Sequence, residues 1–264
     1  MDVIAGASPQ LWARTAGAMY LIIIIGGFFA IGLVPGLTFV SGDAAATARN
    51  IQSHELLYRL GLADHMVLLS IGIPLTLVFY YLFRVVNRPI ALLVVFFLLV
   101  GTAVEGANML NQFVPLVLLD GGPYSGALTA QQLHALSYLA LDLETIGYDI
   151  QQVFYAFYLV FIGYLVFKST FVPRTVGVLL AIAGLCYLTY SFATLVAPGF
   201  ASHLFPYIQL PSFVGEASLC LWLLFAGVNV QRWMQQAGVA GTPAVTSPAS
   251  GAPVRPPEAP RWSR

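Results

Sequence analysis

Residues 89–113 read PIALLVVFFLLVGTAVEGANMLNQF, an almost unbroken apolar run. The run contains no basic residue and one acidic residue, Glu105. A helix that crosses a bilayer needs about 20 mostly apolar residues, so this run is long enough to span one. Five other segments meet the same criterion. The predicted spans cover residues 12–34, 59–83, 89–113, 147–167, 175–196 and 212–233.

The composition agrees with a membrane protein. Hydrophobic residues make up 59% of the chain and charged residues only 8%, whereas soluble domains carry roughly 25% charged residues. So few charges leave too little polar surface for a soluble globule. The formal net charge is zero, which gives no basic field for nucleic acid. We therefore predict an all-α membrane protein, a six-transmembrane helix bundle.

Three regions follow from this pattern: an N-terminus (1–11), a six-span membrane domain (12–235) and a disordered tail rich in Pro and Ala (236–264). In the first loop, Asp43 followed by alanines predicts a short surface helix. Residues 128–146 predict an amphipathic helix before the fourth span, with Thr129 as its cap. It either lies along the membrane surface or extends the fourth span outward.

The basic residues predict the orientation. If the spans alternate in direction, Arg49 and Arg59 fall on one side of the membrane. The opposite side has Arg14, Arg84, Arg88, Lys168, Arg174 and Arg232. Because Lys and Arg are enriched in cytoplasmic loops, we expect both termini in the cytoplasm of a multi-pass protein.

Polar residues within the spans are the candidate functional residues, because an ionisable side chain at membrane depth is costly. At about 1.5 Å per residue, several of them are expected near the outer face. Glu105 and Asn108 share a helix face with Gln112. The candidate ligand-binding residues are Asp64, His65, Glu105, Asn108, Asn111, Asp149 and Glu216, supported by Arg59, Asp142 and Gln112.

Metal and cofactor chemistry have little support in the sequence. The chain contains no HExxH motif, no CxxC motif and no His pair at i, i+4. It also lacks a Walker loop, a dinucleotide fingerprint and a GxSxG elbow. We predict no metal site, no cofactor and no catalytic residue.

The motifs along residues 10–233 resemble the bacterial integral membrane proteins grouped as domain of unknown function 4386. This resemblance implies a compact multi-span bundle in the bacterial cytoplasmic membrane. That family has no assigned activity, so no catalytic role is carried over. The matching residues include Arg14, Gly17, the run GDAAAT at 42–47, Arg59, Gly61, Asp64, the run VNR at 86–88, Asp142, Pro173, Arg174, Gly215, Glu216 and the run LWLL at 221–224.

Three functions remain open at this point. The first is binding or transport of a small cationic or polar ligand, or a proton, through an outward-facing acidic pocket. The second is a structural or partner-binding protein whose polar groups only fix helix packing. The third is an intramembrane enzyme that modifies a lipid or isoprenoid. Membrane lipid is the expected partner, and the oligomeric state is open.

Overall fold

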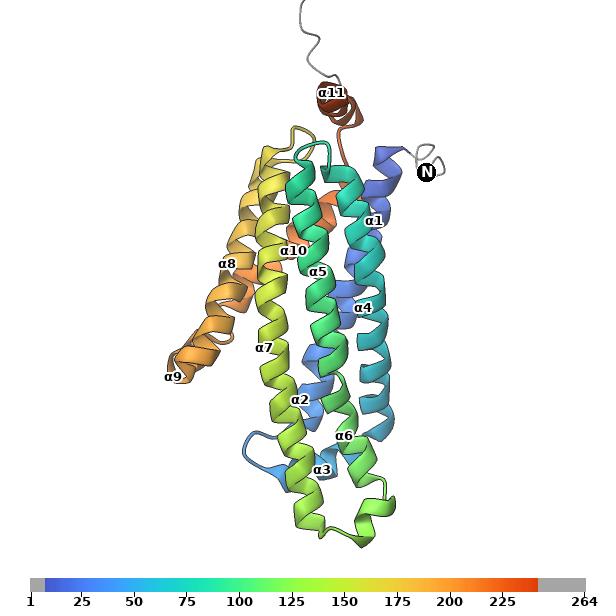
Figure 1. Ribbon diagram of the computed structural model, residues 1–264, viewed down its shortest axis with the longest axis vertical. Coiled ribbons are helices and arrows are strands. Elements are labelled where there is room, and N and C mark those ends of the chain that lie inside the picture. The colour runs from blue at the N-terminus through green and yellow to red at the C-terminus, as the bar shows by residue number, and fades with distance from the viewer. Residues whose placement is uncertain (1–7, 242–264) are drawn as a thin grey trace, which may run out of the picture.

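The computed structural model describes residues 8–241, and every regular element in this range is helical. Six helical stretches are long and apolar enough to cross a membrane, which confirms the predicted six-span bundle. Figure 1 shows them lying lengthwise beside one another. The stretches are Pro9–Thr38, Glu55–Phe83, Arg88–Leu119, Ala130–Lys168, Arg174–Val196 and Gln209–Ala226.

Three of these stretches combine several elements. The first consists of α1 (Pro9–Gly27), the π-helix η1 (Phe28–Leu33) and α2 (Val34–Thr38). The third consists of α5 (Arg88–Asn108) and α6 (Leu110–Leu119), and the last of α10 (Gln209–Leu221) and the π-helix η3 (Trp222–Ala226). The other three are single helices, α4 (Glu55–Phe83), α7 (Ala130–Lys168) and α8 (Arg174–Val196).

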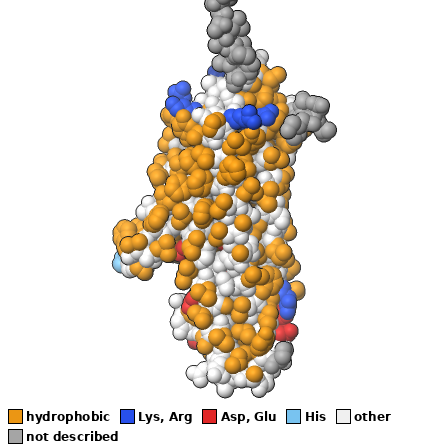
Figure 2. Space-filling view, viewed as in Figure 1, with side chains coloured by type: hydrophobic (Ala, Val, Ile, Leu, Met, Phe, Trp, Pro, Cys, Tyr) orange, Lys and Arg blue, Asp and Glu red, His pale blue; other side chains and the backbone are white. Residues whose placement is uncertain are grey.

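Small residues bring α7 and α8 into backbone contact. A Cβ atom on Gly163 would lie 2.8 Å from the carbonyl oxygen of Gly177, and one on Gly184 would lie 2.7 Å from that of Ala156. Such close approach is the usual way in which helices associate in a bilayer, because moving an apolar side chain from lipid to a helix interface gives little hydrophobic stabilisation. The outward faces carry exposed large apolar side chains (Figure 2), as expected for contact with acyl chains.

Basic residues gather at the end of the bundle that carries the start of α1 and the helix α11 (Val230–Gly241) (Figure 1). We call it the basic end. Arg84 follows α4, Arg88 begins α5, Lys168 ends α7 and Arg174 begins α8. Arg14 lies in the first turns of α1 and Arg232 in α11.

The half of the bundle away from the basic end carries three short helices: α3 (Ala44–Ser53), η2 (Pro123–Gly126) and, nearer the middle, α9 (Pro198–Leu204) (Figure 1). The predicted surface helix in the first loop is confirmed as α3. Asp43 caps it and accepts a hydrogen bond from the Ala46 amide at 2.8 Å. Thr129 caps α7 with a capping box completed by Gln132.

The amphipathic segment before the fourth span extends that span, which confirms the second of the two predicted alternatives, and it is not a separate surface helix. It is the first part of α7, a continuous helix of 39 residues. At 1.5 Å per residue α7 is about 58 Å long, roughly twice the hydrocarbon thickness of a bilayer. In Figure 1, α7 continues well past α9 together with α6 and α3. This part of the bundle therefore extends beyond the apolar layer.

The last span is shorter than predicted, and part of the predicted tail is helical. The sequence predicted a span through residue 233, but it ends at Ala226, and Gly227 turns the chain with φ +69°. Gln10 stabilises the turn by donating to the Ala226 carbonyl and accepting from the Val228 amide. Residues 236–241, assigned to the tail, belong to α11, which Trp233 anchors to Leu82 of α4 and Gln236 to Thr170 of the α7–α8 turn. The rest of the predicted disordered tail, and residues 1–7, lie outside the described residues.

Candidate functional site

Five polar side chains from four helices meet in the half of the bundle away from the basic end. We call them the cavity cluster: His65, Glu105, Asn108, Gln112 and Glu144. The Nε2 atom of His65 lies 3.4 Å from Oε1 of Glu105, and both side chains are almost fully buried. That distance fits an ion pair, yet Glu105 Oε1 has no hydrogen-bond partner. The Asn108 amide lies 3.4 Å from the other carboxyl oxygen.

The i, i+3, i+7 spacing of Glu105, Asn108 and Gln112 predicted one shared face, and their contacts confirm it. Asn108 Nδ2 donates to the main-chain carbonyl of Glu144 at 2.9 Å, and Gln112 Nε2 donates to its carboxyl group at 2.6 Å. Gly147 makes the first contact possible, because a Cβ atom there would overlap the Asn108 amide. The cluster therefore joins α5 and α6 to α7.

A cavity of about 230 Å³ adjoins the cluster, between the first span, α4, α6 and α7. It is smaller than pockets for drug-sized ligands, which occupy roughly 300–1,000 Å³. The Tyr58 hydroxyl on its wall donates to the Gln112 carbonyl at 2.7 Å. The polar lining comprises Thr38, Tyr58, His65, Gln112, Glu144, Thr145 and Tyr148, and apolar residues such as Ile31, Val34, Leu62 and Leu141 complete the wall.

A second polar group, which we call the tyrosine cluster, surrounds Glu216 of α10. Tyr20 of α1 and Tyr187 of α8 donate hydroxyl hydrogen bonds to its carboxyl group at 2.9 Å each. Tyr155 of α7 donates a third, short hydrogen bond. Glu216 is only 8% exposed. Three hydroxyl donors satisfy much of a carboxylate's capacity to accept hydrogen bonds, and they tie four spans together.

The two clusters lie at different depths. Tyr155 precedes Lys168, at the basic end, by thirteen residues, and Tyr187 follows Arg174 by thirteen, which is about 20 Å in each case. Glu105 follows Arg88 by seventeen residues, about 26 Å. The Tyr148 hydroxyl accepts a hydrogen bond from Gln152 Nε2 at 3.2 Å, and Tyr148 also lines the cavity. No hydrogen bond or ion pair among the described residues joins Glu216 to Glu105 directly.

The remaining candidate residues lie around these clusters. Asp64 faces α1, where a Cβ atom on Gly26 would lie 3.0 Å from its Oδ2, an oxygen without a hydrogen-bond partner. Asn111 donates to Asn108 Oδ1 at 3.2 Å. The last three candidates belong to neither cluster. Arg59 pairs with exposed Glu55 at 2.7 Å, Asp142 is exposed, and Asp149 is half-buried on α7.

Sequence reasoning missed Glu144 and four tyrosines, Tyr20, Tyr148, Tyr155 and Tyr187. Glu144 was assigned to a helix outside the spans, because the continuity of α7 was left open. The tyrosines carried a usable signal, since a phenol hydroxyl in an apolar span needs a hydrogen-bond partner. Within residues 8–241, no group of three or more His, Cys, Asp or Glu side chains has the arrangement that would hold a metal ion.

These features define a multi-pass α-helical membrane protein with a polar cavity inside its bundle. The family model described as "Domain of unknown function (DUF4386)" matches residues 15–227, and the chain belongs to this family. Comparison with curated proteins and with solved structures gave no match.

Proposed function

We propose that this membrane protein binds a small polar or cationic ligand in the cavity beside His65, Gln112 and Glu144. The main support is a 230 Å³ space inside the bundle that two carboxyl groups approach: half-buried Glu144 lies on its wall, and buried Glu105 lies behind His65. Burial of ionisable groups in a span is costly and typical of ligand or ion sites. No Lys or Arg lines this space.

The lining favours a small organic cation within this class. Carboxyl groups attract an ammonium group, and tyrosine rings bind cations through their faces. Tyr58 and Tyr148 line the cavity together with Glu144. Amide and imidazole groups of Gln112 and His65 supply hydrogen bonds to a hydroxyl or amine. Choline and putrescine have the matching size and charge.

We further propose that the basic end is cytoplasmic, in the bacterial cytoplasmic membrane implied by the family resemblance. Six basic residues at that end against Arg49 and Arg59 at the other support this orientation. The cavity would then face outward, because it lies in the half of the bundle away from the basic end.

Thermal melting of the detergent-purified protein tests the proposed site. Sodium chloride, choline chloride, putrescine and glycerol are added separately at matched ionic strength. A ligand that binds only the folded protein raises the melting temperature by mass action. We expect at least one compound to do so for the wild type and to lose its effect in Glu144→Gln.

The matched control is Asp142→Asn, an exposed acid on the same helix. It removes the same charge and should keep the shift. A wild-type protein that responds to none of the four compounds, or a Glu144→Gln protein that responds fully, contradicts the proposal. If Asp142→Asn also loses the melting shift, the stabilisation by the compound depends on the overall charge and not on Glu144.

A further inference from the structure

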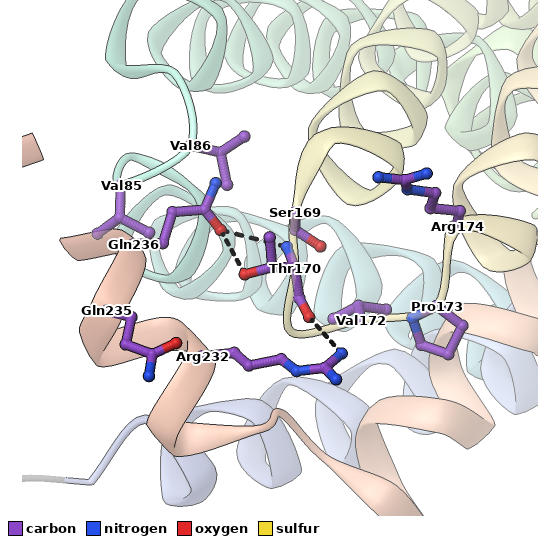
Figure 3. A pocket seen from close by; sticks show the side chains of 10 residues that line it. All are labelled: Val85, Val86, Ser169, Thr170, Val172, Pro173, Arg174, Arg232, Gln235 and Gln236. Atoms are coloured by element: carbon purple, nitrogen blue, oxygen red, sulfur yellow. Dashed lines mark hydrogen bonds between the residues drawn. The ribbon is translucent and has the colours of Figure 1, made fainter. Parts of the chain in front are cut away.

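A second cavity, of about 860 Å³, lies at the basic end, where the α4–α5 turn, the α7–α8 turn and α11 meet (Figure 3). Its polar lining consists of Ser169, Thr170, Arg174, Arg232, Gln235 and Gln236. Valines of both turns form its apolar part. This cavity and the cavity cluster lie toward opposite ends of the bundle.

The walls of this cavity are held together by specific contacts. Trp233 of α11 is buried, stacks on Tyr81 and donates its indole N–H to the Leu82 carbonyl at 2.9 Å. Gln236 Oε1 accepts hydrogen bonds from the amide and hydroxyl of Thr170, at 3.2 and 3.1 Å. α11 is thus fixed against the end of α4 and against the α7–α8 turn, so the walls of the cavity hold a defined position.

The cavity contains unbalanced positive charge. Arg232 donates one hydrogen bond, to the Thr170 carbonyl at 3.3 Å (Figure 3), and Arg174 lies over the Phe167 ring. Neither guanidinium pairs with a carboxylate among residues 8–241, because the acidic residues of that range all lie deeper or toward the opposite end. Each guanidinium has five N–H donors, so most remain available. The Gln235 side-chain amide makes no hydrogen bond to the other residues that line the cavity (Figure 3).

We propose that this cavity binds the phosphate of an anionic phospholipid headgroup, held by Arg174 and Arg232. A guanidinium matches phosphate oxygens with paired N–H donors and binds them in a defined geometry. A lipid is the favoured source of that phosphate because the cavity lies level with the ends of the spans, where headgroups lie. Val85, Val86 and Val172 line it beside the polar groups, as contact with the glycerol region requires.

Native mass spectrometry and melting of the purified protein test this site. Phosphatidylglycerol, phosphatidylcholine and soluble glycerol phosphate are added to separate samples. We expect one tightly bound phosphatidylglycerol, preferred over phosphatidylcholine about tenfold, because phosphatidylcholine carries the same phosphate but adds a quaternary ammonium group that the two guanidinium groups repel. The Arg174→Gln, Arg232→Gln double variant should lose that preference.

The matched control is Arg14→Gln with Arg88→Gln, which removes the same charge from exposed positions at the same end. It should keep the bound lipid. Equal loss in the control, no preference for phosphatidylglycerol, or glycerol phosphate binding as well as the lipid would overturn the proposal. If the double glutamine variant does not fold, Arg174→Lys with Arg232→Lys keeps the charge but removes the guanidinium geometry. Unchanged lipid affinity in that variant would also overturn it.

Discussion

The hydroxyl of Tyr20 in the first span donates a 2.9 Å hydrogen bond to the carboxyl group of Glu216 in the last span, 196 residues further along the chain. The first and last spans are therefore in direct contact inside the bundle. Gly17 extends this contact, because a Cβ atom there would collide with the backbone of Leu224.

Removing the Tyr20 hydroxyl should destabilise the bundle without changing its shape. Tyr20→Phe leaves Glu216 with two of its three donors, at a cost of about 1 kcal/mol. Glu216→Leu should cost more, since it removes the acceptor of all three tyrosine hydroxyls, of which Tyr20 is buried and the other two are half-buried. Thermal melting in detergent measures both effects. Tyr164→Phe is the control, because Tyr164 of α7 is exposed and its hydroxyl makes no hydrogen bond within residues 8–241, so this variant should melt like the wild type. A Tyr20→Phe protein as stable as this control would show that the contact contributes nothing.

Gly147→Ala should disturb the junction between α5 and α7. The new methyl group would overlap the Asn108 amide, and overpacking of this kind costs typically 1–3 kcal/mol. Adding Asn108→Ala should recover part of the loss by clearing the space. Gly106→Ala is the control, because nothing lies within 4 Å of a Cβ there. Equal stability of Gly147→Ala and Gly106→Ala would contradict the close packing at this point.

Gln10→Ala should loosen the turn between the last span and α11. Its side chain accepts from the Val228 amide at 2.9 Å and donates to the Ala226 carbonyl at 3.0 Å. Loss of that acceptor should speed hydrogen exchange of the Val228 amide by about tenfold, the equivalent of 1.4 kcal/mol. Gln131→Ala, at an exposed position of α7, is the control. Unchanged exchange at Val228 would mean that Gln10 does not stabilise the turn.

The proposed orientation predicts which side of the membrane each loop faces. A cysteine at exposed Gln131 should react with an impermeant maleimide added to intact cells, whereas one at exposed Gln231 of α11 should react only after permeabilisation. The native cysteines, Cys186 and Cys220, lie within spans, and the unsubstituted protein measures their background. The reverse labelling pattern would contradict a cytoplasmic basic end.

Much of the fold could be predicted from the sequence, because spans are set by local hydropathy over about 20 residues. Caps at Asp43 and Thr129 were equally local and are found as predicted. The sequence did not predict where α7 begins or where the last span ends. The end of the last span depends on a distant contact, that of Gln10 with Ala226.

The candidate site was predictable only in part. Helix spacing indicated the common face of Glu105, Asn108 and Gln112, because that relationship lies within one span. Depth alone also placed Glu216 near Glu105, whereas the structure surrounds Glu216 with three tyrosines of other spans. Rotation of one helix about its axis relative to another is set by packing, and a single sequence does not encode it locally.

The most direct test of the account fills the proposed cavity without changing any charge. Ala30 lines the cavity and Ala103 lies on the exposed face of α5. The melting temperature of Ala30→Phe and Ala103→Phe is measured with and without the compound, choline or another of the four, that stabilises the wild type. If the ligand binds in this cavity, Ala30→Phe should fold but show no rise in melting temperature with the compound, while Ala103→Phe should show the same rise as the wild type. A full response from a folded Ala30→Phe protein would place the ligand elsewhere and contradict the account.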